Sequence, residues 1–160
     1  FYEFGESWTR RHKSRNRFGG ELIIKNCDSY QDIEEIIKMA KDHPSPEYDC
    51  SFEYYANVLR RILPQPNVKA WIAFEGAPIG YIIAIKDTTG LKNQIMIFDI
   101  FIKDGFRNGI GRDLINEIKT WAIIEKVKRV TWTSQISLKG WERFMGIKAN
   151  EYNSYYWENV

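Results

Sequence analysis

Cysteine and histidine are scarce in this sequence of 160 residues. The two cysteines, Cys27 and Cys50, form no CxxC pair, and only two histidines, His12 and His43, accompany them. This is too small a set of ligands for a tetrahedral zinc site, so we expect no bound metal. Two thiols without a disulfide framework favour an intracellular protein whose cysteines are reduced.

Long apolar runs are also missing. No segment approaches the roughly 18 uninterrupted apolar residues of a membrane helix, and the first residues, FYEFGESWTRR, have neither the charged head nor the apolar middle of a signal peptide. The sequence therefore predicts a soluble, cytoplasmic protein with no membrane partner. Its composition, 44% hydrophobic and 15% aromatic, is ample for a buried core of one domain.

A large net charge is absent as well, because 23 basic residues nearly balance 21 acidic ones. The balance is uneven, since residues 1–20 hold five basic side chains against two acidic ones. We therefore divide the chain into a basic N-terminal arm, residues 1–20, and a single domain, residues 21–160. A terminal basic run is more often a solvated tail or a docking strap than a binding site, but contact with a polyanion stays open. Such a contact would use Arg10, Arg11, Lys13, Arg15 and Arg17.

Apolar periodicity predicts alternating strands and helices in the domain. We expect strands over 21–26, 68–75, 79–86, 94–102, 129–134 and 152–157, and helices over 51–63, 109–126 and 138–145. A further helix should start at Asp28 or Ser29, with Gln31 or Asp32 completing its cap, and end near Ala40. Hairpins come first and strand–helix–strand units later, so the fold class is α/β, with a mixed α+β sheet.

The segment Gln94 to Ile102 (QIMIFDIFI) is apolar on both faces, which is typical of a central strand. Regular alternation would put Met96, Phe98 and Ile100 on one face, and Ile95, Ile97, Asp99 and Phe101 on the other. Asp99 is the only charged residue in this strand. It could be a functional carboxylate or a hydrogen-bonded structural group, and we leave both interpretations open.

A glycine-containing turn, IKDGFRNGIGRDL, follows this strand and opens the next helix. Glycines let a ligand approach the backbone, and the free N–H groups and dipole of a helix N-terminus favour an anion, typically phosphate. Arg107 and Arg112 flank the turn and could pair with further phosphate oxygens. Neither a P-loop nor GxGxxG is present. The glycines Gly109 and Gly111 could equally serve tight packing of strand against helix.

The order of elements, the RNGIGR turn and the later WERFMGIK segment together resemble the GCN5-related N-acetyltransferase (GNAT) superfamily. In that family a [QR]xxGx[GA] loop holds the pyrophosphate of acetyl-CoA. Gly109-Ile110-Gly111 matches its second half and Arg112 matches the basic residue that often follows. Phe106 stands at the Gln/Arg position, and Arg107 lies one step closer to Gly109 than usual.

The resemblance implies a GNAT-like fold that binds acetyl-CoA, or another acyl-CoA, against the strand Gln94 to Ile102. The main chain around Ile100 and Ile102 would bond the pantetheine arm, and this strand would splay from the strand that begins at Val130. The phosphates would contact the turn, through Arg107, Asn108, Gly109, Ile110, Gly111 and Arg112.

The resemblance also implies that an amine attacks the thioester directly in a ternary complex, which needs a base and an acid. Asp99 is our candidate base. The family's usual acidic tyrosine is absent, because Glu142 stands at its position. Tyr152, Tyr155 and Tyr156 are possible replacements, and we take Tyr152, with Glu142 itself, as the candidate catalytic residues. Aromatic residues on a terminal strand are more often packing or interface residues.

The acceptor would be recognised by the loop between the first two helices. This loop carries Glu47, Tyr48 and Asp49, with Tyr55 nearby, which would suit a cationic amine, although a solvated acidic loop has the same composition. Ser134, at a strand exit, is a further candidate contact. The leading function is thus acyl-CoA-dependent N-acylation of a small-molecule or protein amine. A GNAT-like module without catalysis and an enzyme directed to nucleic acid by the arm are the alternatives, and the chain could be a monomer or a homodimer.

Overall fold

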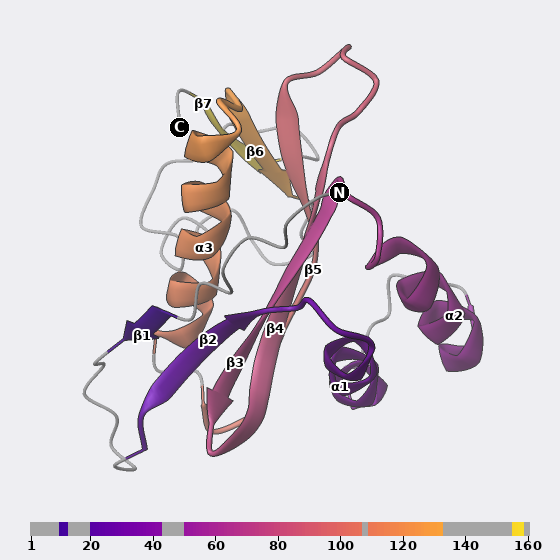
Figure 1. The fold of residues 1–160 in the computed structure, drawn as a ribbon, viewed down its shortest axis with the longest axis vertical. Coiled ribbons are helices and arrows are strands. Elements are labelled where there is room, and N and C mark those ends of the chain that lie inside the picture. The colour runs from indigo at the N-terminus through magenta and orange to yellow at the C-terminus, as the bar shows by residue number, and fades with distance from the viewer. Residues whose placement is uncertain (1–9, 13–19, 43–49, 107–108, 133–154, 159–160) are drawn as a thin grey trace, which may run out of the picture.

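A computed structural model describes residues 10–12, 20–42, 50–106, 109–132 and 155–158 of the chain. Ten elements follow one another in it: β1 (Arg10–His12), β2 (Leu22–Asn26), α1 (Tyr30–Lys41), α2 (Phe52–Ile62), β3 (Val68–Glu75), β4 (Ala77–Lys86), β5 (Gln94–Ile102), α3 (Ile110–Ile124), β6 (Arg129–Trp132) and β7 (Tyr155–Glu158). The strands form one sheet in chain order, β1 to β7 (Figure 1).

The sheet is mixed, which confirms the predicted α/β fold class. Neighbouring strands are antiparallel everywhere except between β5 and β6, which run parallel because α3 connects them. β1 lies inside the basic arm and pairs with β2. The sequence pattern did not predict β1. Among the helices of the described residues, none combines the length and apolar character needed to cross a membrane.

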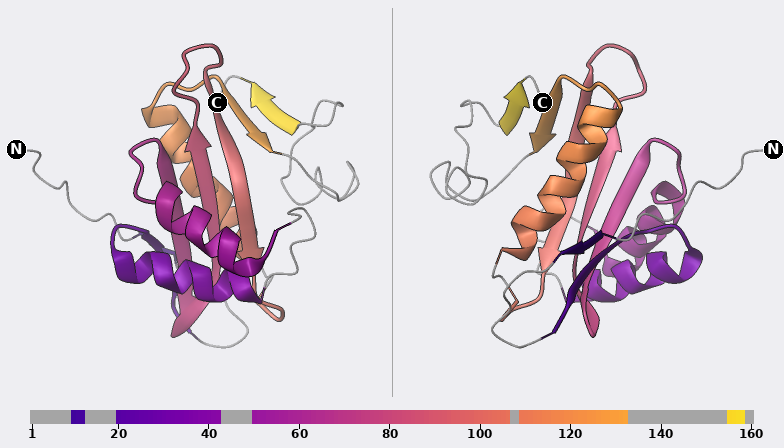
Figure 2. Two further views of the ribbon diagram at one scale, coloured as in Figure 1. Left: turned by 90° about the vertical axis from the view of Figure 1, so that its right-hand side faces the viewer. Right: turned by 60° about the vertical axis from the view of Figure 1, so that its left-hand side comes forward.

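Helices cover both faces of the sheet. α3 packs on one face, and α1 and α2 pack together on the other (Figures 1 and 2). Two separate apolar clusters result, and residues along a strand alternate between them. On β4, Ile82 belongs to the α3-side cluster, while Tyr81 and Ile83 belong to the cluster under α1 and α2. This double coverage explains why β3, β4 and β5 read as nearly continuous apolar runs.

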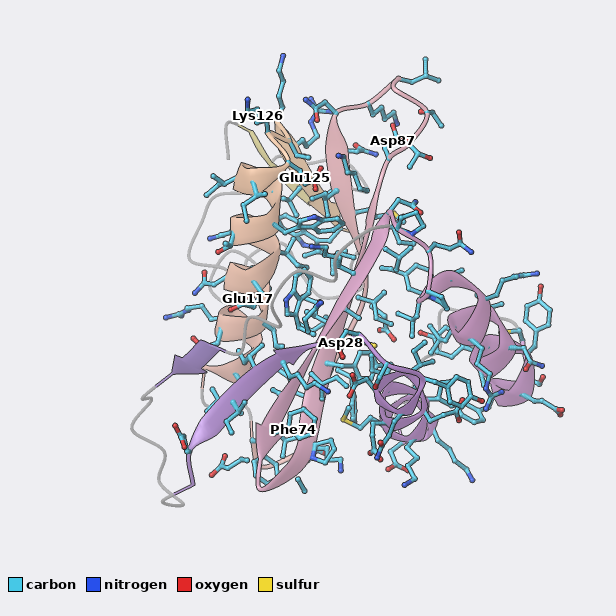
Figure 3. All side chains as sticks on the ribbon, in the orientation of Figure 1. Asp28, Phe74, Asp87, Glu117, Glu125 and Lys126 are labelled. Atoms are coloured by element: carbon cyan, nitrogen blue, oxygen red, sulfur yellow. The ribbon has the colours of Figure 1, made fainter. Side chains whose placement is uncertain are left out.

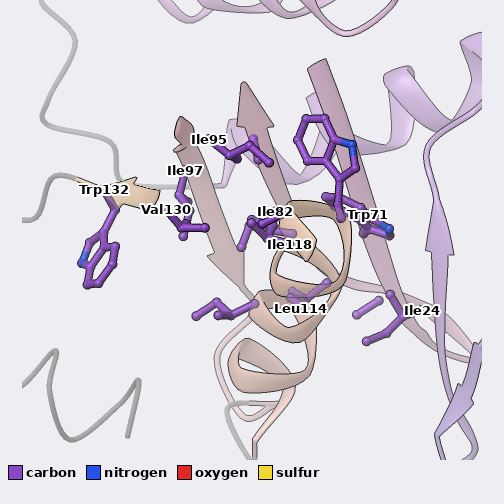
Figure 4. Packing of buried hydrophobic residues seen from close by; sticks show 14 of the residues in the cluster. Ile24, Trp71, Ile82, Ile95, Ile97, Leu114, Ile118, Val130 and Trp132 are labelled. Atoms are coloured by element: carbon purple, nitrogen blue, oxygen red, sulfur yellow. The ribbon is translucent and has the colours of Figure 1, made fainter. Parts of the chain in front are cut away.

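The α3-side cluster forms the larger of the two cores (Figure 4). Side chains from α3, such as Leu114 and Ile118, lie against Ile82 and Ile95 of the central strands. Their burial is complete or nearly so, which makes them the main source of hydrophobic stabilisation on this face. Trp132 of β6 extends the same cluster.

Local sequence signals fix most element boundaries. Ser29 is the N-cap of α1 and forms a capping box with Asp32, so the second of the two predicted caps is used. α3 ends at Ile124, two residues before its predicted end, and Lys126 has a positive φ of 53°. β4 begins at Ala77 instead of Ile79, because Gly76 alone, with φ 74°, turns the chain.

Parts of the prediction lie outside the described residues. These are the helix expected over 138–145, the last two positions of the strand expected over 129–134, and the first part of the strand expected over 152–157. The described end of that last strand, β7, pairs antiparallel with β6.

Candidate functional site

A β-bulge in β5 decides where Asp99 points. Asp99 pairs with Ile83 of β4, and Ile97 pairs with the next residue, Ala84, so Phe98 is an extra residue without a partner position. An extra residue shifts the alternation of side chains by one place. The strand is therefore not regular, and the prediction from regular alternation is wrong at this point.

The clusters show the corrected faces. Ile95, Ile97 and Ile100 all pack on the α3 side, whereas Phe98 and Phe101 pack on the side of α1 and α2. Phe98 and Ile100 were predicted to share a face, and the bulge separates them. Asp99, predicted to lie beside Ile97, instead makes its hydrogen bonds among residues of the α1 and α2 side.

Two tyrosines hold the Asp99 carboxylate. The Tyr55 hydroxyl of α2 and the Tyr81 hydroxyl of β4 each donate a hydrogen bond of 2.7 Å to the same oxygen, Oδ2. Tyr81 is wholly buried and Tyr55 is 7% exposed, while Asp99 is half-buried. The Phe101 ring lies 5.9 Å from that of Tyr81. The carboxylate thus stands in an aromatic setting with its orientation determined by two donors.

Sequence reasoning missed Tyr81 and did not connect Tyr55 with Asp99. A usable signal was present for Tyr81, because it is the only hydroxyl in the apolar segment IGYIIAIK. A buried phenol requires a hydrogen-bond partner, and the nearest strand offers one charged group, Asp99.

One side of β5 is open beyond its first residues. The ladder with β6 runs only from Gln94 and Arg129 to Met96 and Thr131, while β5 continues to Ile102. Within the described residues, no strand pairs with 97–102 on that side, and β6 leans away from β5 (Figure 2). In the described part of the chain, the ladder between the two strands therefore covers only the first three residues of β5. A strand edge beyond the end of a ladder is a place where an extended ligand can bind as an added strand.

The glycine turn ends beside this open strand. Gly109 has φ 87° and is the N-cap of α3, where it provides no side-chain hydrogen bond to the first helical N–H groups. A Cβ at Gly109 would meet nothing within 4 Å, so close packing is not the reason for glycine at this position. Glycine here serves the left-handed backbone conformation, and it leaves an exposed helix N-terminus that favours an anion.

The predicted cofactor residues differ in what they can contribute. Ile110 is buried in the α3-side cluster, so only its main chain can face a ligand. Arg112 is exposed on the first turn of α3, and Gly111 is buried there. Ile100 and Ile102 are half-buried on the open part of β5. These residues lie along one path from β5 to α3, because Ile102, Phe106 and Ile110 pack against the same cluster.

Many predicted site residues lie outside the described part of the chain: Arg107, Asn108, Glu47, Tyr48, Asp49, Ser134, Glu142 and Tyr152. Of the three predicted catalytic residues, Asp99 alone is described. In the described part of the chain, no three His, Cys, Asp or Glu side chains gather closely enough to hold a metal ion.

A groove of about 490 Å³ lies elsewhere, between the β2–α1 junction and the α2–β3 loop, and its lining includes Cys27 and Lys69. None of its lining residues belongs to β5 or α3. Burial, with the nearby Asp32 and Asp28 carboxylates, raises the pKa of the Cys27 thiol to about 12. The thiol therefore stays protonated at neutral pH and is a poor nucleophile.

Comparison with protein families gives one match. The model of the acetyltransferase (GNAT) family matches residues 30–146. This range includes the β5 bulge, the glycine turn and α3. No curated protein is similar enough in sequence to match.

Solved structures share the fold at low sequence identity. A GNAT-family acetyltransferase from Staphylococcus aureus Mu50 is 15% identical with a TM-score of 0.66, covering 86% of this chain and 99% of its own. The AAC(6')-Iy structure in complex with the bisubstrate analog CoA-S-monomethyl-acetylneamine is 16% identical with a TM-score of 0.65, covering 82% and 93%. A ribosomal-protein-alanine N-acetyltransferase from Brucella melitensis biovar Abortus 2308 is 15% identical with a TM-score of 0.61, covering 82% and 94%. At these identities the likeness concerns the fold.

Proposed function

The chain belongs to the acetyltransferase (GNAT) family, and from this premise we propose that it transfers an acetyl group from acetyl-CoA to a primary amine by direct attack in a ternary complex. The observation that carries the proposal is a juxtaposition. The open side of β5, the uncapped N-terminus of α3 and the Asp99 carboxylate lie along one strand and the turn that follows it.

The residues present fit the cofactor. The main chain around Ile100 and Ile102, beyond the end of the β5–β6 ladder, would offer donors and acceptors to the pantetheine arm, whose amides need such partners. Gly109 leaves the first N–H groups of α3 for the pyrophosphate, and Arg112 adds a positive charge on the same turn. Arg107 and Asn108 complete this proposed contact. The bound cofactor supplies an activated acyl group as a thioester.

Asp99 is the proposed base. The ammonium group of the acceptor first releases one proton to solvent; the neutral nitrogen then attacks the carbonyl carbon, the C–N bond forms, and Asp99 accepts the second proton that the nitrogen loses. The C–S bond breaks and the sulfur leaves with the electron pair. Glu142 or Tyr152 is proposed to return a proton to this thiolate. On the acceptor side, Glu47, Tyr48 and Asp49, with Ser134, are proposed to contact a cationic amine, for which a fixed carboxylate is the suitable counter-charge.

Calorimetric titration tests the cofactor site. We would titrate acetyl-CoA into the parent protein and into two matched variants, Gly109→Asp and Gly109→Asn. Both side chains tolerate positive φ, and a Cβ at this position meets nothing within 4 Å. Only aspartate places a negative charge where the pyrophosphate should bind. We expect binding to the parent, and an affinity at least about 10-fold lower for Gly109→Asp than for Gly109→Asn.

Two results would contradict the proposal. If the folded parent binds no acetyl-CoA at millimolar concentration, the chain is not an acetyl-CoA-dependent enzyme. Equal affinities of Gly109→Asp and Gly109→Asn would remove the phosphate site from the start of α3. If binding holds, release of free thiol on adding a primary amine completes the test of transfer.

A further inference from the structure

We infer that Tyr55 and Tyr81 are positioning residues that together fix the Asp99 carboxylate for the acceptor amine. This inference rests on the proposed function, and it adds two residues that neither the motif nor the strand pattern assigns. Its basis is that both phenolic hydroxyls lie 2.7 Å from one oxygen, Oδ2 of Asp99.

The three residues come from three different elements. Tyr55 lies on α2, in the layer of helices, 44 positions before Asp99, and Tyr81 lies on the neighbouring strand β4, 18 positions before it. One hydrogen bond therefore ties the carboxylate to the sheet, and the other ties it to the helical layer. The direction of the second carboxylate oxygen, Oδ1, is defined as a result, because rotation of the carboxylate would break both bonds.

Burial limits the other hydrogen-bond partners that the hydroxyls of Tyr55 and Tyr81 could use in place of Asp99. Tyr81 is 0% exposed and Tyr55 is 7% exposed, so water cannot readily replace a lost partner. An ionised carboxylate only accepts hydrogen bonds, so both phenols act as donors to it. Bonds with a charged partner are about twice as strong as neutral ones, which makes them suitable for holding a side chain still.

Two hydrogen bonds from buried hydroxyls would satisfy even a fully buried carboxylate. Asp99 nevertheless remains half-buried, and the bulge at Phe98 turns it to the α1 and α2 side of the sheet. Asp99 thus faces the layer formed by α1 and α2, the two helices that precede and follow positions 47–49 in the sequence. The acceptor nitrogen would therefore meet a carboxylate whose position is fixed before binding, which is the condition for efficient attack.

Kinetics of tyrosine variants test this inference. Tyr55→Phe, Tyr81→Phe and the double variant would be compared with the parent, with acetyl-CoA as donor and butane-1,4-diamine, a lysine-containing peptide and a peptide with a free N-terminus as probe acceptors. Since either bond alone still orients the carboxylate, we expect each single variant to lower kcat/KM for the amine only about 3- to 5-fold. The double variant should lose about 100-fold, more than the product of small single effects. The KM for acetyl-CoA should stay unchanged.

Two controls separate positioning from a general effect on the fold. Tyr54→Phe changes the neighbouring residue on α2, which is 60% exposed, and should leave all constants unchanged. In an Asp99→Ala background, Tyr55→Phe should cause no further loss of kcat/KM, because its target is gone. This background comparison uses only single tyrosine changes, so it remains valid even if the double variant does not fold.

Specific outcomes would overturn the inference. If Tyr55→Phe lowers activity equally with and without Asp99, the tyrosine does not act through the carboxylate. A rise of the acetyl-CoA KM equal to that of the amine would also exclude an acceptor-side role. Both results require an active parent, so they are distinct from failure of the proposed function, in which the parent itself binds no acetyl-CoA.

Discussion

Asp32 is the buried carboxylate that joins the end of β2 to the start of α1. Both of its oxygens accept from Lys25 Nζ, at 2.9 and 3.0 Å, and Oδ2 also accepts from the main-chain N–H groups of Asp28 and Ser29, each at 3.2 Å. Burial alone would raise its pKa, but hydrogen bonds with Lys25, Ser29 and the Asp28 amide outweigh this and lower the pKa. The ionised form is therefore the one that stabilises the fold.

We predict that Asp32→Asn lowers the free energy of unfolding at pH 7 by about 1–2 kcal/mol, because it removes a capping and charged interaction. A depressed folded pKa contributes stability that is present above the unfolded value, about 3.9, and is lost as the pH falls through the folded value. The difference between parent and variant should therefore shrink at pH 3. Urea unfolding at both pH values measures it.

Asp28→Asn is the matched control, because the Asp28 side chain is 44% exposed and lies 3.8 Å from Lys25. Exposed ion pairs contribute little, so its effect should stay within about 0.5 kcal/mol. A loss in Asp32→Asn that is the same at pH 7 and pH 3 would show that the ionised carboxylate is not the stabilising species.

At this scale, what the sequence can reveal depends on distance along the chain. The capping box of Ser29 and Asp32 is visible in the sequence because its partners are three residues apart. The partners of Asp99 are not, since Tyr55 lies 44 positions away and meets it only after α2 has packed on the sheet. The sequence was enough to single out Asp99 as the charged residue of a buried strand. It was not enough to predict the hydrogen bonds that Tyr55 and Tyr81 donate to it.

At the scale of elements, Gly80 is a place where β4 and β5 leave no room for a side chain. A Cβ at this position would lie 2.7 Å from the main-chain oxygen of Phe101. Backbone cannot move aside as a flexible side chain can, so glycine is required here by space. This contact lies two residues from Asp99 along β5 and beside Tyr81 on β4.

We predict that Gly80→Ala lowers the free energy of unfolding by about 1–3 kcal/mol, the usual range for overpacking. Gly76→Ala, at the start of the same strand, is the comparison: it meets open space and incurs only the strain of its positive φ, about 1–2 kcal/mol. Crystal structures or amide chemical shifts should show β4 displaced near Phe101 in the first variant and unchanged in the second. An undisplaced β4 in Gly80→Ala would contradict the steric argument.

Element boundaries were more predictable than the faces of elements. The predicted strand Gln94 to Ile102 matches β5, because its length and composition alone indicate a buried strand. The bulge at Phe98 was not predictable, since the letters are compatible with regular alternation and only pairing with β4 reveals the extra residue. The same limit applies to β1, whose three residues carry no alternating pattern and form a strand through their pairing with β2.

At the scale of the whole molecule, helices cover both faces of the sheet, so its main chain is accessible mainly at strand ends and edges. The edge of β5 beyond Met96, where its described ladder with β6 has ended, is such a place, and the chain runs from it to the start of α3. At the other end of α3, Glu125 forms an ion pair with Lys86 of β4, and Glu125 and Asp87 lie at the same end of the molecule (Figure 3). α3 is thus fastened to the sheet at its C-terminal end, while its N-terminal end is exposed at Gly109.

A ligand that bridges β5 and the start of α3 should stabilise the whole fold, because it binds the folded state and not the unfolded one. At 100 times its Kd, acetyl-CoA should add about 2.7 kcal/mol to the free energy of unfolding. For a domain of this size that corresponds to a rise in Tm of about 5–10 °C, measured by a thermal scan. The Gly109→Asp variant should show a smaller rise in Tm than Gly109→Asn at equal ligand concentration, because its charge opposes the phosphate.

Hydrogen exchange locates the binding site: amides of 97–102 and of the first turn of α3 should gain more protection than those of α1. Among amides that exchange through local opening, equal gains in protection at α1 and at 97–102 would indicate that the ligand binds elsewhere.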